Sequence, residues 1–226
     1  MNRNVSFASR HRNVLIETNK VLRNTYLLLG MTFMFSSLIA YLAFIFNVQP
    51  LNPLLMIFGV YGLMFLTNSL RHSSLGLLSV FAFTGFLGYS LGPTINYYVM
   101  NFANGYHLVN VALGGTGVIF FALSGYVLVT RKDFNFLSGF LFVSTMVSFL
   151  FMIVGVVFHI QIIELIISSL FILLSSGLIL FQTSEIVYGG ETNYIMATLS
   201  LYVSIYNLFI SILSVLGFFT SSSNKE

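Results

Sequence analysis

The segment FQTSEIVYGGETNY, residues 181–194, carries two of the six acidic residues of the chain, Glu185 and Glu191. Carboxylates beside a break in an apolar sequence can form a gate or hold a cation, and they can also mark a turn between two buried helices. We expect Glu185 to point into the cytoplasmic mouth of a helical bundle and Glu191 to cap or flank a helix start. The segment is a turn on both interpretations, and its role as a gate is a hypothesis.

The glycine pair Gly189–Gly190 predicts how that turn is built. Glycine accepts the left-handed conformation that ends many helices, so we expect the preceding helix to stop at Tyr188. Thr192 is the expected N-cap of the following helix, because its hydroxyl can accept a hydrogen bond from a free backbone N–H group.

Three polar residues flank this turn within the apolar segments. Gln182 and Ser204 are nearly equidistant from the turn on antiparallel helices, so a rise of about 1.5 Å per residue places them at similar depth. Asn207 shares a helix face with Ser204 and extends a polar stripe. The stripe can line a pore, or Gln182 and Ser204 can form an interhelical hydrogen bond worth about 0.6–2 kcal/mol.

Residues 88–92, GYSLG, match the G-x-S-x-G pattern of serine hydrolases, which holds a serine on a strained turn near a histidine and an acid. The pattern here lies inside an apolar span, and all four histidines lie in tails or at span ends. We therefore interpret Gly88 and Gly92 as a packing face, expect no enzyme, and predict that Ser90→Ala changes no activity. Pro93 is expected to kink the helix and open a local cavity.

Other candidate sites are weaker. Residues 114–117, GGTG, lack the strand and the lysine of a phosphate loop and are interpreted as a second packing face. His107 and His159 have no metal-ligand spacing, so no metal or cofactor is expected. Glu164 is a charged residue about one turn inside a span, where it can reach the interface or form a mouth for cations.

The composition sets the environment in which these residues lie. Hydrophobic residues make up 57% of the 226 residues and charged residues only 7%, and the mean hydropathy is +0.94. A soluble domain carries about 25% charged residues, so the solvent of this chain is lipid. The absence of cysteine excludes disulfides, thiol nucleophiles and Cys-ligated metals. The net charge of +3 does not indicate nucleic-acid binding, because the basic residues lie in tails and loops.

Seven apolar segments are long enough to cross a bilayer, which requires about 20 residues each. We therefore predict an all-α integral membrane protein, a bundle of seven transmembrane helices over residues 24–219, between an N-terminal tail, 1–23, and a short polar C-terminal tail, 220–226. The predicted spans are residues 25–46, 52–70, 75–99, 108–130, 135–158, 160–181 with a continuation to Tyr188, and 193–219.

The basic residues predict the orientation, since Lys and Arg are retained on the cytoplasmic side. Eight of the nine fall on one side when the N-terminus is cytoplasmic, and only Lys225 falls on the other. We expect the tail 1–23 to be a flexible cytoplasmic arm rather than an interfacial helix. The eight are Arg3, Arg10, Arg12, Lys20, Arg23, Arg71, Arg131 and Lys132.

Three long segments carry a family resemblance: NTYLLLGMTFMFS (24–36), FAFTGFLGYSLGPTINYY (81–98) and TSEIVYGGETNYIMATLSLYVSIYNLFISILSVLGF (183–218). They resemble the Bax inhibitor-1 family, in particular its bacterial branch. The resemblance implies a bundle in which six helices surround a central seventh. Several family members are pH-sensitive calcium leak channels that use two aspartates, on the sixth and seventh helices, with an arginine on the second.

The chain departs from that pattern at the aspartates. Gln182 and Ser204 occupy the two positions, and neither side chain titrates. Arg71 is the candidate counterpart of the arginine. The resemblance thus leaves a calcium or proton leak without the two-aspartate pH switch as an alternative function, with Arg71, Gln182, Glu185, Ser204 and Asn207 as candidate pore or gate residues.

The bacterial branch implies a different function, which we favour. Its members modulate the membrane-anchored ATP-dependent protease FtsH and its partner complex HflK–HflC in the inner membrane. The resemblance implies a slowly processed substrate that limits the attack of the protease on other membrane proteins. A protease of this kind starts from a cytoplasmic tail, so residues 1–23 are the expected point of engagement. The candidate residues are Arg3, Arg10, Arg12, Lys20 and Arg23.

Overall fold

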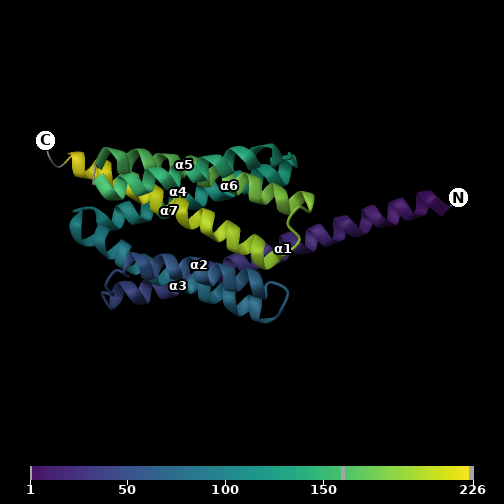
Figure 1. The fold of residues 1–226 in the computed structure, drawn as a ribbon, viewed down its shortest axis with the longest axis horizontal. Helices are drawn as coiled ribbons and strands as arrows, with labels where there is room; N and C mark the ends of the chain where they lie inside the picture. The colour runs from purple at the N-terminus through teal and green to yellow at the C-terminus, as the bar shows by residue number, and fades with distance from the viewer. Residues whose placement is uncertain (1, 159–160, 224–226) are drawn as a thin grey trace.

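The computed structural model describes residues 2–158 and 161–223, and every regular element in them is helical (Figure 1). Long helices are the expected outcome in lipid, because each backbone N–H and C=O must find a partner within the chain. The elements are α1 (Asn2–Ile45), α2 (Pro53–Leu70), α3 (Leu75–Asn101), α4 (Gly105–Thr130), the short helix η1 (Asn135–Leu137), α5 (Ser138–Phe158), α6 (Gln161–Tyr188) and α7 (Tyr194–Ser223).

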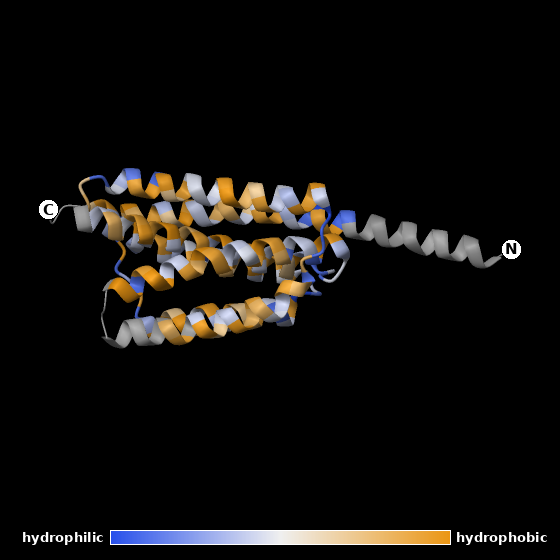
Figure 2. Cartoon of the chain, turned by 90° about the horizontal axis from the view of Figure 1, so that it is seen from above, coloured by the Kyte–Doolittle hydropathy of each residue, from blue (hydrophilic) through white to orange (hydrophobic). Residues whose placement is uncertain are grey.

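Six of these helices have the length and apolar composition of membrane spans. They contain apolar stretches of 18 to 28 residues in α1, α2, α3, α4, α6 and α7. Figure 2 shows hydrophilic residues concentrated at the helix ends and connections, with hydrophobic residues along the helix bodies. The all-α, multi-pass membrane protein is thereby confirmed.

The fifth predicted crossing corresponds to α5, which is 21 residues long. Among the residues searched there, the apolar stretch covers Asn135–Ser148 and is shorter than a span. Figure 1 places the two ends of the chain at opposite ends of the bundle, as an odd number of crossings requires. A seventh crossing at α5 remains a prediction.

The ends of the helices follow from local residue types. Asn52 caps α2 by accepting a hydrogen bond from the Leu54 N–H at 2.9 Å, and Pro53 fills the first helical position. Gly189, with φ of 77°, ends α6 directly after Tyr188, as the glycine pair predicts. The structure continues α1 back to Asn2, so the N-terminal tail is helical there, and its flexibility remains a prediction.

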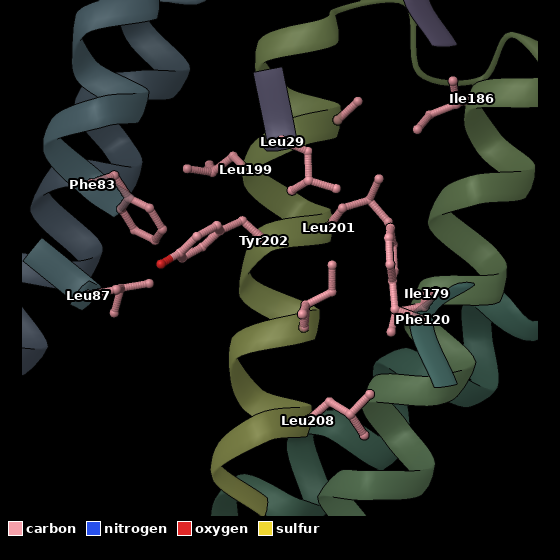
Figure 3. Close-up of a cluster of buried hydrophobic side chains, with 12 residues drawn as sticks. Leu29, Phe83, Leu87, Phe120, Ile179, Ile186, Leu199, Leu201, Tyr202 and Leu208 are labelled. Carbon is pink, nitrogen blue, oxygen red and sulfur yellow. The ribbon is translucent and has the colours of Figure 1, made fainter. Parts of the chain in front are cut away.

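Helix α7 packs against α1, α2, α3, α4 and α6. Half of its apolar stretch is buried, compared with 6% for α2. Figure 3 shows Tyr202 of α7 pointing toward Phe83 and Leu87 of α3. Among the described residues α5 contacts only α6 and η1, so five helices, rather than the six implied by the family resemblance, contact α7.

Two glycines of α3 form a closed seam with α1. A Cβ on Gly88 would lie 2.5 Å from the carbonyl oxygen of Ser36, and a Cβ on Gly92 would overlap Ala43. Both glycines are buried. The packing face predicted from the GYSLG pattern is therefore confirmed, and α1 and α3 approach so closely because neither glycine has a side chain.

Candidate functional site

Two of the backbone hydrogen bonds that close the α6–α7 turn go to the same carbonyl. The N–H groups of Gly190 and Glu191 donate to the carbonyl oxygen of Glu185 at 2.8 and 3.2 Å. A Cβ on Gly190 would lie 2.5 Å from Oε2 of Glu185, so the half-buried carboxylate lies against the turn. Gly190 therefore provides the space that this carboxylate occupies.

Asn193, and not Thr192, caps α7. Its Oδ1 accepts hydrogen bonds from the N–H groups of Ile195 at 3.0 Å and Met196 at 3.2 Å. The prediction of Thr192 is wrong because α7 begins at Tyr194, which places the N-cap one residue later. Glu191 flanks the helix start, where its Oε1 accepts from the Asn193 N–H at 2.7 Å.

The same Asn193 side chain ties the α6–α7 turn to the α2–α3 loop. Its Nδ2 donates to the carbonyl oxygen of Arg71 at 2.8 Å. The exposed Arg71 side chain itself donates from Nε to Nε2 of His72 at 3.1 Å. The contacts seen bring the backbone of Arg71, rather than its guanidinium, to the candidate site.

Gln182 and Ser204 meet between α6 and α7. Ser204 Oγ donates to Gln182 Oε1 at 3.1 Å and also lies 3.1 Å from the carbonyl oxygen of Ser200. Ser204 is buried, whereas Gln182 and Asn207 are half-buried. The Gln182–Ser204 pair is thus a neutral interhelical hydrogen bond, which holds the seam without taking up or releasing a proton.

Further hydroxyl pairs join the helices in the same way. Ser124 and Thr183 pair at 3.3 Å between α4 and α6, and Ser168 donates to Ser214 at 2.9 Å between α6 and α7. Since lipid drives no hydrophobic association of helices, such bonds and close packing hold a membrane bundle together.

Ser90 of the GYSLG pattern belongs to this set of hydroxyls. It donates to the Leu87 carbonyl oxygen at 2.7 Å and pairs with the Tyr206 hydroxyl at 3.0 Å. These contacts supply neither the histidine nor the acid of a hydrolase. A cavity of about 420 Å³ adjoins Ser90, Pro93 and Tyr206, as expected beside a proline inside a helix.

The GGTG segment of α4 was predicted to be a packing face, but two of its glycines have open space around them. A Cβ on Gly114 or Gly117 would meet no atom within 4 Å, and one on Gly115 would meet only Ile212 at 3.9 Å. The packing face predicted for residues 114–117 is therefore wrong at Gly114 and Gly117. Gly117 instead lines a cavity of about 400 Å³, which the sequence does not reveal because a pattern cannot show what lies opposite a glycine.

The remaining candidates lie apart from the α6–α7 seam. Glu164 is exposed in the first turn of α6, and Lys20 and Arg23 are exposed on α1. The side chains of Arg3, Arg10 and Arg12, and all of His159, lie outside the described residues. Within the described part of the chain, no three histidine or acidic side chains gather as a metal site would require.

Comparison with known proteins matches residues 18–221 to the family "Inhibitor of apoptosis-promoting Bax1". The chain is 49% identical to "Modulator of FtsH protease YccA" of Escherichia coli strain K12, over 96% of this chain and 98% of that one. The same identity and coverage hold for "Inner membrane protein YccA" of a second E. coli strain. An uncharacterized protein of Pseudomonas aeruginosa is 50% identical over 89% of this chain and 90% of its own.

The family match covers all six helices with the properties of spans, and it includes both the α1–α3 seam and the α6–α7 seam. The relatives share nearly their full lengths with this chain. The chain belongs to the Bax inhibitor-1 family.

Proposed function

We propose that this protein modulates a membrane-anchored ATP-dependent protease of the FtsH type. The observation that carries the proposal is the 49% identity, over 96% of the chain, to the E. coli protein named as a modulator of that protease. The proposed location is the bacterial inner membrane, with the N-terminus in the cytoplasm and the C-terminus in the periplasm. HflK–HflC is the proposed companion complex.

The proposed mechanism is slow processing from the N-terminal tail, residues 1–23. Lys20 and Arg23 are exposed, and α1 runs without a break from the tail into the bundle. A pull on the tail is therefore transmitted to the α1–α3 seam, where Gly88 is in close contact with α1. A span that must leave such a seam is extracted slowly, which occupies the protease and protects other membrane substrates.

A calcium or proton leak is not favoured by the candidate pore residues. Ser204 and Gln182 form a neutral hydrogen bond, and Arg71 points to His72. The Gln182–Ser204 contact holds α6 and α7 together and provides no titrating group to open a gate.

The test is co-purification of FtsH and HflK–HflC from native membranes in mild detergent, with the partners quantified by mass spectrometry. The full chain is compared with a variant lacking residues 2–18, which keeps the whole apolar stretch from Asn19. A matched variant replaces residues 2–18 with an uncharged, unstructured sequence of equal length. The lifetime of each protein and of a reference FtsH substrate is followed in the same cells.

We expect the full chain to enrich the protease and to prolong the lifetime of the reference substrate, and the deletion to lose both effects. Equal enrichment by all three proteins would contradict engagement through the tail while leaving modulation intact. No enrichment by any of them, together with an unchanged substrate lifetime, would overturn the proposed function itself.

A further inference from the structure

A groove between α1 and α4, with α7 as its floor, encloses the cavity of about 400 Å³. We call it the α1–α4 groove. Among the described residues, α1 and α4 share no direct backbone packing, although each packs against α7. Aromatic pairs bridge the two helices at its ends, Tyr26 with Phe120 and Phe44 with Tyr106. Its lining includes Gly30, Ala40, Leu113, Gly117, Ile205 and Phe209.

The groove lies at the depth of the hydrocarbon core and is apolar. Its residues come from four apolar spans, α1, α3, α4 and α7. The hydroxyls of Ser37 and Thr116, which line it, donate to carbonyl oxygens of their own helices. Away from Tyr26, this apolar space next to the bilayer core favours hydrocarbon, because water finds few hydrogen-bond partners there.

The length and volume of the groove suit an acyl chain. The lining extends from Tyr26 to Ala40 of α1, about 21 Å at the rise of a helix, and the cavity volume is about 400 Å³. A single hydrocarbon chain fits, since nonbonded carbons approach to about 3.5–4.0 Å.

Polar groups at one end match the head of a phospholipid. The Tyr26 hydroxyl is buried and has no hydrogen-bond partner among the described residues. Lys20 and Arg23 are exposed within two turns of Tyr26 on the same helix. Cations near the membrane surface attract anionic headgroups, and a tyrosine hydroxyl can donate to an ester carbonyl.

We propose that the α1–α4 groove is a binding site for one acyl chain of an anionic phospholipid, whose headgroup lies near Lys20 and Arg23. The lipid would fill the space between α1 and α4 that no side chain of the described bundle occupies. The site does not depend on the proposed protease function.

The test uses glycines that have open space around them. Gly30→Leu and Gly117→Leu put bulk into the groove without meeting protein atoms within 4 Å of the new Cβ. Gly125→Leu is the matched control, because Gly125 also has open space and lies on α4 but does not line the groove. Each full-length protein is reconstituted with phosphatidylglycerol that carries a photoreactive diazirine halfway along one acyl chain.

Cross-linked peptides are then mapped by mass spectrometry, and the lipid retained after detergent washing is measured by native mass spectrometry. We expect the wild type and Gly125→Leu to retain one phosphatidylglycerol and to cross-link through groove residues such as Phe121. The Gly30→Leu/Gly117→Leu protein should lose both signals but keep cross-links at lipid-facing residues of α2, such as Phe58.

Equal retention by all variants, or cross-links no denser at the groove than on α2, would overturn the proposal. Cross-links in native membranes that join the groove to another protein would assign it to a partner helix instead, and would also overturn it. Arg23→Gln with Lys20→Gln is expected to reduce retention of phosphatidylglycerol but not of phosphatidylcholine. An equal loss of both lipids would contradict the placement of the headgroup.

Discussion

Glycines lie where α1 faces two other helices, α3 and α4. They are tightly enclosed at α3 and surrounded by open space at α4. At the α1–α3 seam, Gly88 has the backbone of Ser36 so close that even a methyl group would clash. Across the α1–α4 groove, Gly30 and Gly117 face open space. In a water-soluble core such a gap would be costly, but next to a bilayer it can be filled by lipid. Glycine therefore occurs both at closed helix contacts and at openings in this protein. Which of the two forms depends on what lies opposite the glycine.

The strongest test of the difference between the α1–α3 seam and the α1–α4 groove is to place a leucine at one glycine of each. Gly88→Leu should lower the free energy of unfolding by more than about 3 kcal/mol or prevent folding, because backbone atoms cannot move aside. Gly117→Leu should stay within about 1 kcal/mol of the wild type, since the helix gains a better helix former and no protein atom has to move. Unfolding of the purified proteins in mixed micelles measures both, and similar losses would refute the distinction between seam and groove.

Introducing two carboxylates into the α6–α7 seam tests whether its stability depends on a neutral contact. Gln182→Asp combined with Ser204→Asp places two carboxylates at hydrogen-bond distance, so at neutral pH we expect a loss of about 2–3 kcal/mol. Protonation of one carboxylate relieves the repulsion, so stability should rise as the pH falls, whereas the neutral wild-type pair gives no such dependence.

Flux measurements in liposomes complete that experiment. If the seam is only a packing contact, neither protein should pass calcium or protons at any pH. A pH-dependent flux through the double variant would show that a pore lies behind Gln182 and Ser204 and would restore the leak as the leading function.

The hydrogen bonds of Asn193 at the α6–α7 turn should have a smaller effect on stability. Asn193→Ala removes the cap of α7 and the bond to the Arg71 carbonyl, and should cost about 1–2 kcal/mol. Thr192→Ala, one residue away and exposed, should cost less than about 0.5 kcal/mol. Equal losses of unfolding free energy for the two variants would contradict Asn193 as the cap of α7 and would favour Thr192.

The smallest effect is expected for a single hydroxyl in the seam. Ser204→Ala should lower the free energy of unfolding by about 0.6 kcal/mol, the usual value of one interhelical hydrogen bond in a membrane. Ser169→Ala is the control, because its exposed hydroxyl bonds only to its own helix, at Leu165. A loss above about 2 kcal/mol would mean that Gln182 has no other partner once the hydroxyl is gone.

Features governed by local residue types could be predicted from the sequence. Gly189 ends α6 because a left-handed residue is needed directly after Tyr188. The meeting of Gln182 and Ser204 followed from counting residues away from that turn, since antiparallel helices rise equally. The error at Thr192 is one residue, because both it and Asn193 are good capping residues and the start of α7 decides between them.

Features that depend on the partner across a gap could not be predicted. GGTG and GYSLG look alike as small-residue patterns, yet Gly117 faces open space and Gly88 a backbone carbonyl. Arg71 is a candidate gate residue by its place in the sequence, but the sequence does not show that its carbonyl oxygen accepts a hydrogen bond from Asn193, because that depends on how the loop folds. Such outcomes depend on the tertiary arrangement, which a single sequence does not specify.

The α1–α3 seam also determines how the protein would respond to force. Its contacts run in parallel along both helices, from Phe35 against Gly85 to Asn47, whose Oδ1 accepts from Asn96 Nδ2 at 2.7 Å. A load applied to the N-terminal end of α1 acts along this line and shears all the contacts together, instead of unzipping them one at a time. Mechanical resistance of this kind depends on the direction of pulling, and the same bundle would yield more readily to a load applied sideways.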